Sequence, residues 1–161
     1  MTPPIRVGIG FDVHRLVEGR RLILAGVEVP SDVGPVAHSD GDAVLHAVAD
    51  AILGAAGLGD LGEHFPDTDP AFKDAASSDI LGRVVEMARD AGWAVAGADV
   101  NVLLERPNLA PHKDAMRQRL TELLALEPGA VGLKARTLEG LGLIGAGEAV
   151  AAQAVVVLSS I

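Results

Sequence analysis

Acidic and imidazole side chains concentrate in one segment of the chain, residues 37–69. Within it Asp42, His46 and Asp50 follow one another at intervals of four residues, so on a helix they form one polar line. The residues between them are almost all apolar, which predicts that the rest of this helix is buried. Buried carboxylates and imidazoles are costly without a partner. A metal ion, a substrate, another subunit, or water along a solvated edge would each satisfy this polar line.

A second pair of candidate ligands precedes this segment. Asp12 and His14 are two residues apart in a predicted strand, so both side chains point to one face of it. If the helix that carries His46 packs beside that strand, the three side chains converge. Because the chain has no cysteine, a zinc site must use histidine and carboxylate ligands. Two imidazoles and one carboxylate are typical of catalytic zinc with an open fourth position. Unrelated structural roles for the three residues are the alternative.

Two further positions have residue types that suit phosphate or cation chemistry. His38 precedes the predicted helix, where it is either placed to meet an anion at the helix N-terminus or simply solvated. Thr137 and Glu139 face one way on an extended stretch, and Glu139 is either a ligand for a hard cation or a surface charge. The glycine-rich residues 140–147 lack the Gly-Lys-Ser/Thr of a Walker motif and are interpreted as a turn. Two histidines receive no role: His64 and His112.

The elements that must position these residues follow from periodicity and from turn residues. Strands are predicted at residues 5–16, 21–29 (as one strand or a hairpin), 93–104, 130–135 and 149–158. Helices are predicted at 41–56, 80–91 and 111–126, the second capped by Ser78 or Asp79, with loops at 31–35 and 57–78. Strands and helices are interspersed without strict alternation. This order favours a single α+β domain over residues 1–161, with one mixed or antiparallel sheet and helices packed on one face.

Composition excludes several classes of function. The 161 residues contain 13 Lys and Arg against 22 Asp and Glu, a net charge of −9, which argues against nucleic acid as a partner. No uncharged apolar run is long enough to span a membrane, and the first residues do not resemble a signal peptide. The absence of cysteine fits a reducing compartment, so a cytoplasmic protein is expected. The many small apolar residues indicate close-packed surfaces, some of them between subunits.

Three stretches together are more specific than any single residue: GFDVHRL (10–16), AHSDGDAVLHAVADAILGAAGLGDLGEHFPDTDP (37–70) and KARTLEGLG (134–142). They resemble the 2-C-methyl-D-erythritol 2,4-cyclodiphosphate synthase family, and the resemblance covers essentially the whole chain. It implies a homotrimer with active sites between neighbouring subunits. It also implies a lyase that converts 4-diphosphocytidyl-2-C-methyl-D-erythritol 2-phosphate to the cyclic diphosphate, with release of CMP, when the 2-phosphate attacks the β-phosphate.

The resemblance further implies a set of site residues and cofactors. Zinc, one per subunit, would be held by Asp12, His14 and His46, and Mg²⁺ or Mn²⁺ would be held by Glu139 together with substrate phosphates. His38 and Thr137 would stabilise the developing charge, with Ser39 beside them. The erythritol part would contact Asp60, Leu61, Gly62, Phe65, Pro66, Asp67, Thr68 and Asp69. The cytosine part would lie against Leu104, Glu105, Arg106, Pro107, Asn108, Leu109 and Ala110. Asp12, His14, Arg136, Leu138, Glu139 and Leu143 complete the expected substrate contacts.

The chain departs from the common pattern of that family near its end, at Arg136, Leu138, Gly140 and Ala146. Members of that family often have threonines at the positions of Arg136 and Leu138, a lysine at that of Gly140 and an arginine at that of Ala146. Arg136 itself adds positive charge beside the expected phosphates. Two other functions stay open on the residues alone. One is a zinc phosphodiesterase or cyclase that acts on another nucleotide-linked phosphate. The other is a non-catalytic trimeric binding module whose histidines and aspartates are structural.

Overall fold

A computed structural model describes residues 3–161, so residues 1 and 2 of the expected domain lie outside the described part. A five-stranded sheet has the order β4-β1-β7-β5-β6. Its strands are β1 (Ile5–Glu18), β4 (Val33–Pro35), β5 (Trp93–Leu103), β6 (Val131–Arg136) and β7 (Ala149–Ser160). Only β5 and β6 pair in parallel among the described strands, and the other pairs are antiparallel. The sheet is therefore mixed, as predicted.

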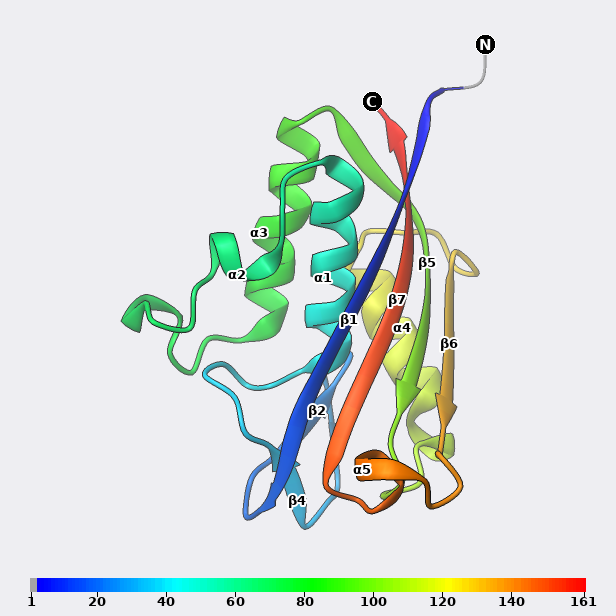
Figure 1. The fold of residues 1–161 in the computed structure, drawn as a ribbon. Helices are drawn as coiled ribbons and strands as arrows, with labels where there is room; N and C mark the ends of the chain where they lie inside the picture. Colours follow the sequence, from blue (N-terminus) through cyan, green and yellow to red (C-terminus); the bar gives the residue numbers. More distant parts are fainter. Residues whose placement is uncertain (1–2) are drawn as a thin grey trace.

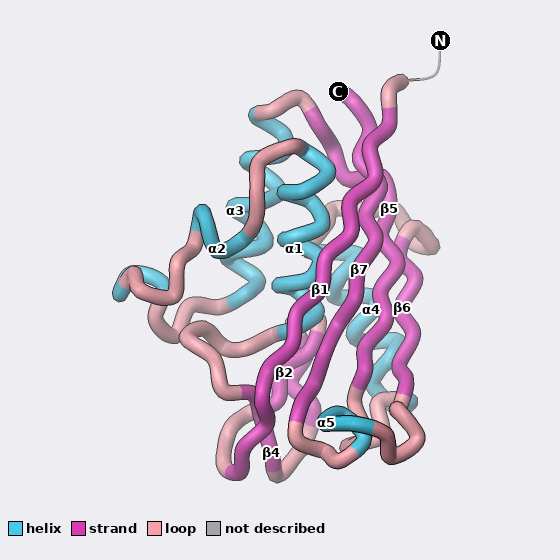
Figure 2. The backbone as a smooth tube through the Cα atoms, viewed as in Figure 1, coloured by secondary structure: helices cyan, strands magenta, loops and turns pink. Residues whose placement is uncertain are grey.

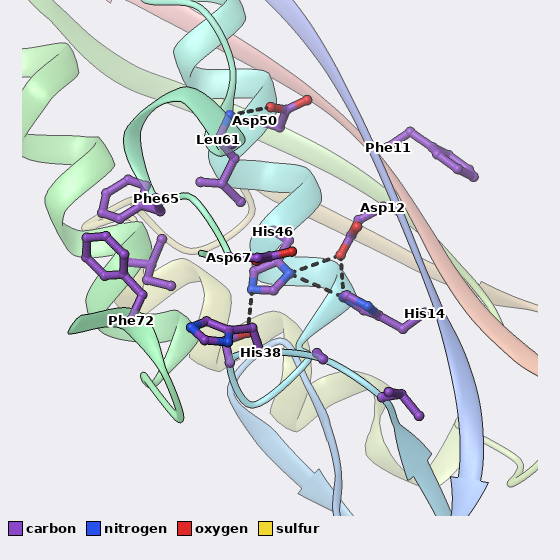
Figure 3. Close-up of a pocket in the computed structure, with 15 residues that line it drawn as sticks. Phe11, Asp12, His14, His38, His46, Asp50, Leu61, Phe65, Asp67 and Phe72 are labelled. Carbon is purple, nitrogen blue, oxygen red and sulfur yellow. Dashed lines mark hydrogen bonds and ion pairs between the residues drawn. The ribbon is translucent and has the colours of Figure 1, made fainter. Parts of the chain in front are cut away.

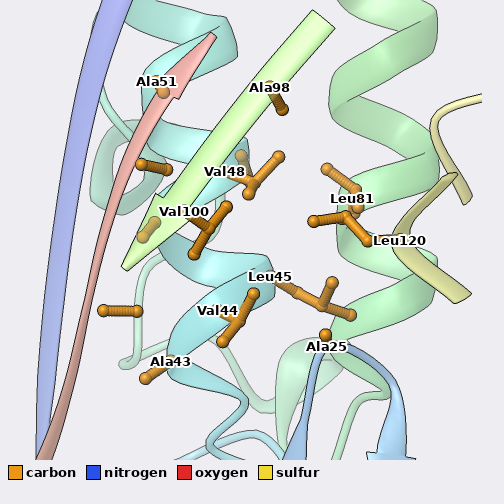
Figure 4. Packing of buried hydrophobic residues seen from close by; sticks show 14 of the residues in the cluster. Ala25, Ala43, Val44, Leu45, Val48, Ala51, Leu81, Ala98, Val100 and Leu120 are labelled. Carbon is orange, nitrogen blue, oxygen red and sulfur yellow. The ribbon is translucent and has the colours of Figure 1, made fainter. Parts of the chain in front are cut away.

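Three long helices cover one face of this sheet: α1 (Ala43–Ala56), α3 (Ser77–Asp90) and α4 (Lys113–Leu123) (Figure 1). The predicted layers are therefore correct. Helix α1 lies against β1 and β7 on one side and α3 on the other. This is why eleven of its residues are buried. Val44, Leu45 and Val48 of α1 meet Leu81 of α3 and Leu120 of α4 in the core (Figure 4). The apolar helix of the sequence is thus the centre of the packing.

The opposite face of the sheet is apolar but uncovered along β1. Alternate side chains of a strand point to opposite faces, and the odd-numbered residues of β1 from 5 to 13 are exposed by 50 to 67%. These residues are Ile5, Val7, Ile9, Phe11 and Val13. Together we call them the outer β1 stripe. An exposed apolar stripe of this kind usually marks a contact with another chain.

The segment predicted as one strand or a hairpin is a hairpin, formed by β2 (Leu22–Leu24) and β3 (Val27–Val29). Its turn residues Ala25 and Gly26 both have positive φ, 51° and 73°. Their amides donate to the carboxylate of Asp42, at 3.0 and 2.7 Å. Asp42 also caps α1 by accepting from the amide of Leu45 at 3.1 Å. One fully buried carboxylate therefore joins the hairpin turn to the start of the central helix.

We expect Asp42→Ala to lower the free energy of unfolding by about 3 kcal/mol or more. The substitution removes a helix cap and leaves buried amide donors without an acceptor, each worth about 1–3 kcal/mol. Urea denaturation measures this loss. Asp79→Ala, which removes an exposed carboxylate in the first turn of α3, is the matched control, and its effect should stay within about 0.5 kcal/mol. Equal losses in the two variants would contradict the role given to Asp42.

The same carboxylate makes this loss depend on pH. Burial raises the pKa of Asp42 from 3.8 to about 6, although hydrogen bonds from backbone amides oppose the rise. The folded state therefore holds the proton more tightly than the unfolded state. This stabilisation is fully present below pH 3.8 and is lost as pH rises through about 6. The destabilisation measured for Asp42→Ala should accordingly become smaller between pH 4 and pH 7, which is about the range that spans both pKa values.

Several loops contain short elements that the sequence analysis did not predict (Figure 2). The predicted loop 31–35 contains β4, which pairs with the end of β1. The predicted loop 57–78 contains α2 (Leu61–His64) and the 3₁₀ turn η1 (Pro70–Phe72), capped by Asp60 and Asp69 respectively. The glycine-rich turn contains α5 (Gly142–Gly145). These elements are too short for a periodic signal; side-chain caps support α2 and η1, and pairing with β1 supports β4.

Two helix boundaries also differ from the prediction. Helix α3 begins at Ser77 rather than residue 80, and neither Ser78 nor Asp79 is its N-cap, because Ala76 has that position. The predicted helix 111–126 is shorter: a 3₁₀ turn, η2 (Ala110–His112), precedes α4, and Ala125 with a φ of 51° lies beyond its end. No helix among residues 3–161 is long and apolar enough to cross a membrane.

Candidate metal centre

Asp12, His14 and His46 form one cluster, as predicted from their spacing (Figure 3). The Oδ2 atom of Asp12 lies 2.8 Å from Nε2 of His14 and 3.0 Å from Nδ1 of His46. The two imidazole nitrogens are 3.4 Å apart. A tetrahedral ion with bonds of about 2.0–2.1 Å needs donor atoms about 3.3 Å apart. The spacing of the three donor atoms therefore fits a small tetrahedral cation.

The local sequence explains why these residues meet. The even-numbered positions of β1 face α1, which places Asp12 and His14 on the covered side of the strand. Gly8 and Gly10 occupy the same face, four and two residues before Asp12. A Cβ atom at Gly10 would lie 1.8 Å from the carbonyl oxygen of Ala47, the residue after His46. The absence of side chains at these two positions lets α1 approach β1 closely enough for His46 to join the pair.

The charges of the cluster support one another. Burial alone would raise the pKa of Asp12, but the hydrogen bonds and charges of His14 and His46 outweigh burial and lower it to about 2. Burial by itself would lower the pKa of His46, and the Asp12 carboxylate beside it reverses that effect, so the pKa is raised. Asp12 is thus an anion at any ordinary pH. The carboxylate that favours positive charge on His46 in this way also favours a bound divalent cation.

The cluster lies in an open pocket with a volume of about 340 Å³. Nine predicted site residues line it: Asp12, His14, His38, Ser39, His46, Leu61, Gly62, Phe65 and Asp67. Six other lining residues were not predicted as site residues: Phe11, Val36, Ala37, Asp50, Phe72 and Ile80. The ring of His38 contacts the carbonyl oxygen of Asp69 at 3.2 Å. This contact joins the segment before α1 to the loop that was expected to hold the erythritol part.

The polar line of the sequence analysis is divided among different partners. Asp42 accepts backbone amides, as described, and Asp50 accepts the amide of Leu61 at 3.0 Å. Only His46 contributes to the cluster. His64, which received no role, contacts the carbonyl oxygen of Leu58 at 2.6 Å and so has a structural partner. The chain itself therefore satisfies the two carboxylates, and no ligand is needed for them.

A second set of predicted residues lies elsewhere on the molecule. Residues 104–110 follow β5, and residues 136–139 begin at the last residue of β6; β7 separates both strands from β1 in the sheet. Within residues 3–161, none of these residues lines the pocket at the cluster. Leu104 and Leu109 are core residues, exposed by only 3 and 4%, so their side chains are not available to a ligand. One chain thus carries two separate parts of the predicted site.

Glu105 has a role that sequence reasoning missed. Its carboxylate accepts the amides of Leu138 and Gly140, at 3.0 and 3.3 Å. Between these two residues Glu139 has a φ of 53°, in the left-handed region that is uncommon for residues other than glycine. Glu105 therefore holds the loop that presents Thr137 and Glu139. A carboxylate 33 residues away from its partner in the sequence leaves no local signal for this contact.

The chain is thus an α+β protein with a mixed sheet covered on one face by helices, and two histidines and one aspartate form a candidate metal centre in its pocket. The model of the YgbB family matches residues 5–159. A curated relative from Salinibacter ruber, named 2-C-methyl-D-erythritol 2,4-cyclodiphosphate synthase, is 57% identical over 156 residues, which is 97% of this chain and 99% of the relative. The chain belongs to the YgbB family, whose curated relatives at this level of identity are 2-C-methyl-D-erythritol 2,4-cyclodiphosphate synthases.

Solved structures agree with this membership. The bifunctional IspDF from Campylobacter jejuni superposes with a TM-score of 0.95 at 42% identity, over 99% of this chain and 43% of that longer chain. A 2C-methyl-D-erythritol-2,4-cyclodiphosphate synthase in its CDP-bound form gives a TM-score of 0.89 at 44% identity, over 96% of this chain and 100% of the other. The predicted family and its class of enzyme are therefore confirmed.

Proposed function

We propose that this chain is a lyase that converts 4-diphosphocytidyl-2-C-methyl-D-erythritol 2-phosphate to 2-C-methyl-D-erythritol 2,4-cyclodiphosphate. In this reaction an oxygen of the 2-phosphate forms a bond to the β-phosphorus, and the bond from that phosphorus to the CMP oxygen breaks. CMP leaves with the electron pair. The observation that carries the proposal is the Asp12, His14 and His46 cluster in the pocket of a chain 57% identical to a curated cyclodiphosphate synthase.

The chain's own residues would act mainly by positioning. An intramolecular attack needs its two phosphates held in one geometry, and little covalent chemistry is left for the protein. His38 and Ser39 line the pocket beside the cluster, where their polar groups suit phosphate oxygens. Leu61, Gly62, Phe65 and Asp67 line the other wall and suit the erythritol part. Asp60, Pro66, Thr68 and Asp69 belong to the same loop and complete this part of the proposal.

Zinc is the metal we propose for the cluster, one ion per chain, held by the two imidazole nitrogens and one carboxylate oxygen. When bound, it supplies positive charge to phosphate oxygens as the new bond forms. A cation is also what an acidic chain needs to hold a substrate with three phosphates, because its net charge of −9 otherwise repels it. The donor types and their spacing support this assignment.

Glu139 is the residue we propose as the protein ligand of a second cation, Mg²⁺ or Mn²⁺, which the substrate phosphates would share. Its carboxylate is exposed, and the backbone of its loop is held by Glu105. Oxygen donors of this kind suit such hard cations. Thr137 lies two residues before it, with its hydroxyl 3.5 Å from the Glu139 amide, and would contact the same phosphates. Arg136, Leu138 and Leu143 complete the proposed contacts at this end.

We expect Glu139→Gln to raise the Mg²⁺ concentration needed for half-maximal activity by about tenfold, which corresponds to about 1.4 kcal/mol. The amide keeps the size of the side chain but loses the charge that a hard cation prefers. A titration of initial rate against MgCl₂ measures the shift. Glu127→Gln removes an equally exposed carboxylate on another loop and should leave the titration unchanged. Superimposable curves for Glu139→Gln and the wild type would count against the assignment.

A homotrimer is the assembly we propose, with each active site between two neighbouring chains. Two observations support it. The parts of the predicted site lie on strands separated by β7 and do not line one pocket in the single chain, and a neighbouring chain would supply the missing part. The outer β1 stripe leaves a continuous apolar face for another copy to cover. In such an assembly the loop after β5 of one chain, including Arg106, Pro107, Asn108 and Ala110, would provide the cytosine pocket.

We expect Ile9→Lys to convert the assembly into monomers of 16.5 kDa and to abolish turnover. Ile9 lies in the middle of the stripe and is 67% exposed in the single chain, so a lysine there costs nothing in the monomer. Burying that charge between chains without a partner is costly. Light scattering after size-exclusion chromatography measures the mass. Ile9→Val keeps the surface apolar and should preserve the assembly. A fully assembled Ile9→Lys protein would rule out this face as the interface.

The proposed reaction itself is tested by product analysis. The purified protein with zinc and MgCl₂ should release CMP and the cyclic diphosphate in equal amounts from the named substrate. In water enriched in ¹⁸O neither product should gain the label, because no water takes part. Label in either product would favour a phosphodiesterase instead, and CDP binding without turnover would favour a binding module. The proposal also includes a single domain over residues 1–161, consistent with a family match over 5–159, and a cytoplasmic location.

A further inference from the structure

The imidazole of His46 has a second nitrogen that faces away from the metal cluster. Its Nε2 atom lies 2.8 Å from the hydroxyl oxygen of Ser77 and 3.2 Å from that of Ser39. Ser77 is the first residue of α3 and is only 1% exposed. It does not line the pocket, whereas Ser39 does. The closer partner of this nitrogen is therefore a buried hydroxyl on a different helix.

The carboxylate of Asp40 decides in which direction that hydroxyl bonds. Asp40 accepts the hydroxyl proton of Ser77 and also the amide of Ser77, the latter at 3.0 Å. It accepts the amide of Asp42 as well, at 3.1 Å. An ionised carboxylate can only accept, and a serine hydroxyl has one proton. Because the Ser77 hydroxyl donates that proton in its hydrogen bond to Asp40, the Ser77 oxygen must accept a hydrogen bond from His46.

These directions assign the proton of the imidazole. Nε2 of His46 carries hydrogen and donates it to Ser77, so Nδ1, which lies 3.0 Å from Oδ2 of Asp12, is the nitrogen left to bind a metal ion. We propose that Asp40 and Ser77 are positioning residues, which orient the His46 ring and keep Nδ1 as its metal-binding atom. The inference rests on the proposed metal site. It concerns residues outside the three ligands and outside the pocket lining.

The same arrangement leaves Ser39 available for substrate. Since Ser77 accepts the hydrogen bond from Nε2 of His46, the Ser39 hydroxyl does not need to accept one from it. Ser39 accepts the amide of Gly41 at 3.2 Å, and its own proton is free to point into the pocket. Two serines close to one nitrogen thus have different roles. Ser77 supports the ligand, and Ser39 is the hydroxyl placed to donate to a phosphate oxygen.

A purely structural role for Ser77 makes a different prediction. Asp40 accepts the first amide of α3, whose own N-cap residue Ala76 provides no side-chain bond. Ser77 and Asp40 therefore also join the segment before α1 to the start of α3. If that were their whole role, removal of the hydroxyl would lower stability equally with and without zinc. A positioning role instead reduces the extra stability that zinc provides.

The test measures zinc retention in the zinc-loaded protein. Ser77→Ala should lose half its zinc at an EDTA concentration about 10–100-fold lower than the wild type, the range typical for loss of a residue that supports a ligand. Ser78→Ala removes a neighbouring hydroxyl, for which no contact with His46 exists among the described residues, and should match the wild type within about twofold. Asp40→Asn keeps the size of the side chain but places an amide donor opposite groups that themselves donate hydrogen bonds. This variant should therefore also lose its zinc at a lower EDTA concentration.

Urea denaturation with and without zinc provides the second measurement. In Ser77→Ala the increase in unfolding free energy on zinc addition should be smaller than in the wild type and in Ser78→Ala. Should Ser77→Ala fail to fold, Asp40→Asn decides the question in the same two assays. Unchanged zinc retention in the folded variants would overturn this inference alone. A wild-type protein that binds no zinc would overturn the proposed metal site, and this inference with it.

Discussion

Replacing His46 with alanine should abolish turnover and zinc binding while the protein stays folded and assembled. His46 supplies one of the three donor atoms, and Asp12 and His14 alone leave too few ligands for a stable site. A metal ion that neutralises the negative charge developing on the phosphates stabilises the transition state by several kcal/mol. A loss of about 4 kcal/mol corresponds to roughly a thousandfold in rate. Metal analysis should fall from about one zinc per chain to background, and CMP release should fall below detection.

The matched control is another histidine outside the pocket. His112 lies in η2, and His112→Ala should retain zinc and full activity. Light scattering and circular dichroism of His46→Ala should match the wild type, because the outer β1 stripe and the core do not involve the imidazole. Wild-type activity in His46→Ala would refute the metal centre. Loss of assembly in that variant would instead mean that His46 acts structurally.

Replacing Gly10 with alanine should have the second large effect, although Gly10 touches neither metal nor substrate in the proposal. The new Cβ would lie 1.8 Å from the carbonyl oxygen of Ala47, a backbone atom that cannot move unless α1 moves. Overpacking of this kind costs about 3 kcal/mol or more when backbone must shift. Because His46 precedes Ala47, any displacement of α1 also separates His46 from Asp12. Both unfolding free energy and zinc affinity should therefore fall.

Gly54→Ala on the same helix is the control for this variant. A Cβ at Gly54 meets nothing within 4 Å, so alanine there should stabilise α1 by about 0.5–1 kcal/mol. Zinc retention in Gly54→Ala should equal that of the wild type. If Gly10→Ala unfolds at the wild-type urea concentration and keeps its zinc, then the close approach of α1 and β1 does not position the ligands.

Much of the cluster could be predicted from the sequence, because its residues lie on regular elements. A strand places residues two apart on one face, which paired Asp12 with His14, and an apolar helix predicted the buried position of His46. The mixed sheet with helices on one face followed from the order of the same elements. The polar line was only partly informative. Asp42 and Asp50 bind backbone amides, which the spacing of carboxylates alone does not reveal.

The support of the site lies beyond sequence reasoning, since it depends on contacts between distant segments. Ser77 contacts His46, which is 31 residues away in the sequence, and Glu105 accepts the amide of Leu138, which is 33 residues away. Ser77 gave no signal of its own, because a serine near a helix start is first interpreted as part of a cap. The short elements α2, α5 and β4 were missed for another reason, because three or four residues are too few to show a period.

The sequence by itself determined the three metal-binding candidates, the layered α+β architecture and the family, because these depend on residue types and on the period of regular elements. Only the tertiary structure decided which nitrogen of His46 faces the cluster and that the predicted site is divided between the two sides of β7. Hydrogen-bond direction and strand order both arise from pairing between segments far apart in the chain. A linear pattern does not encode that pairing.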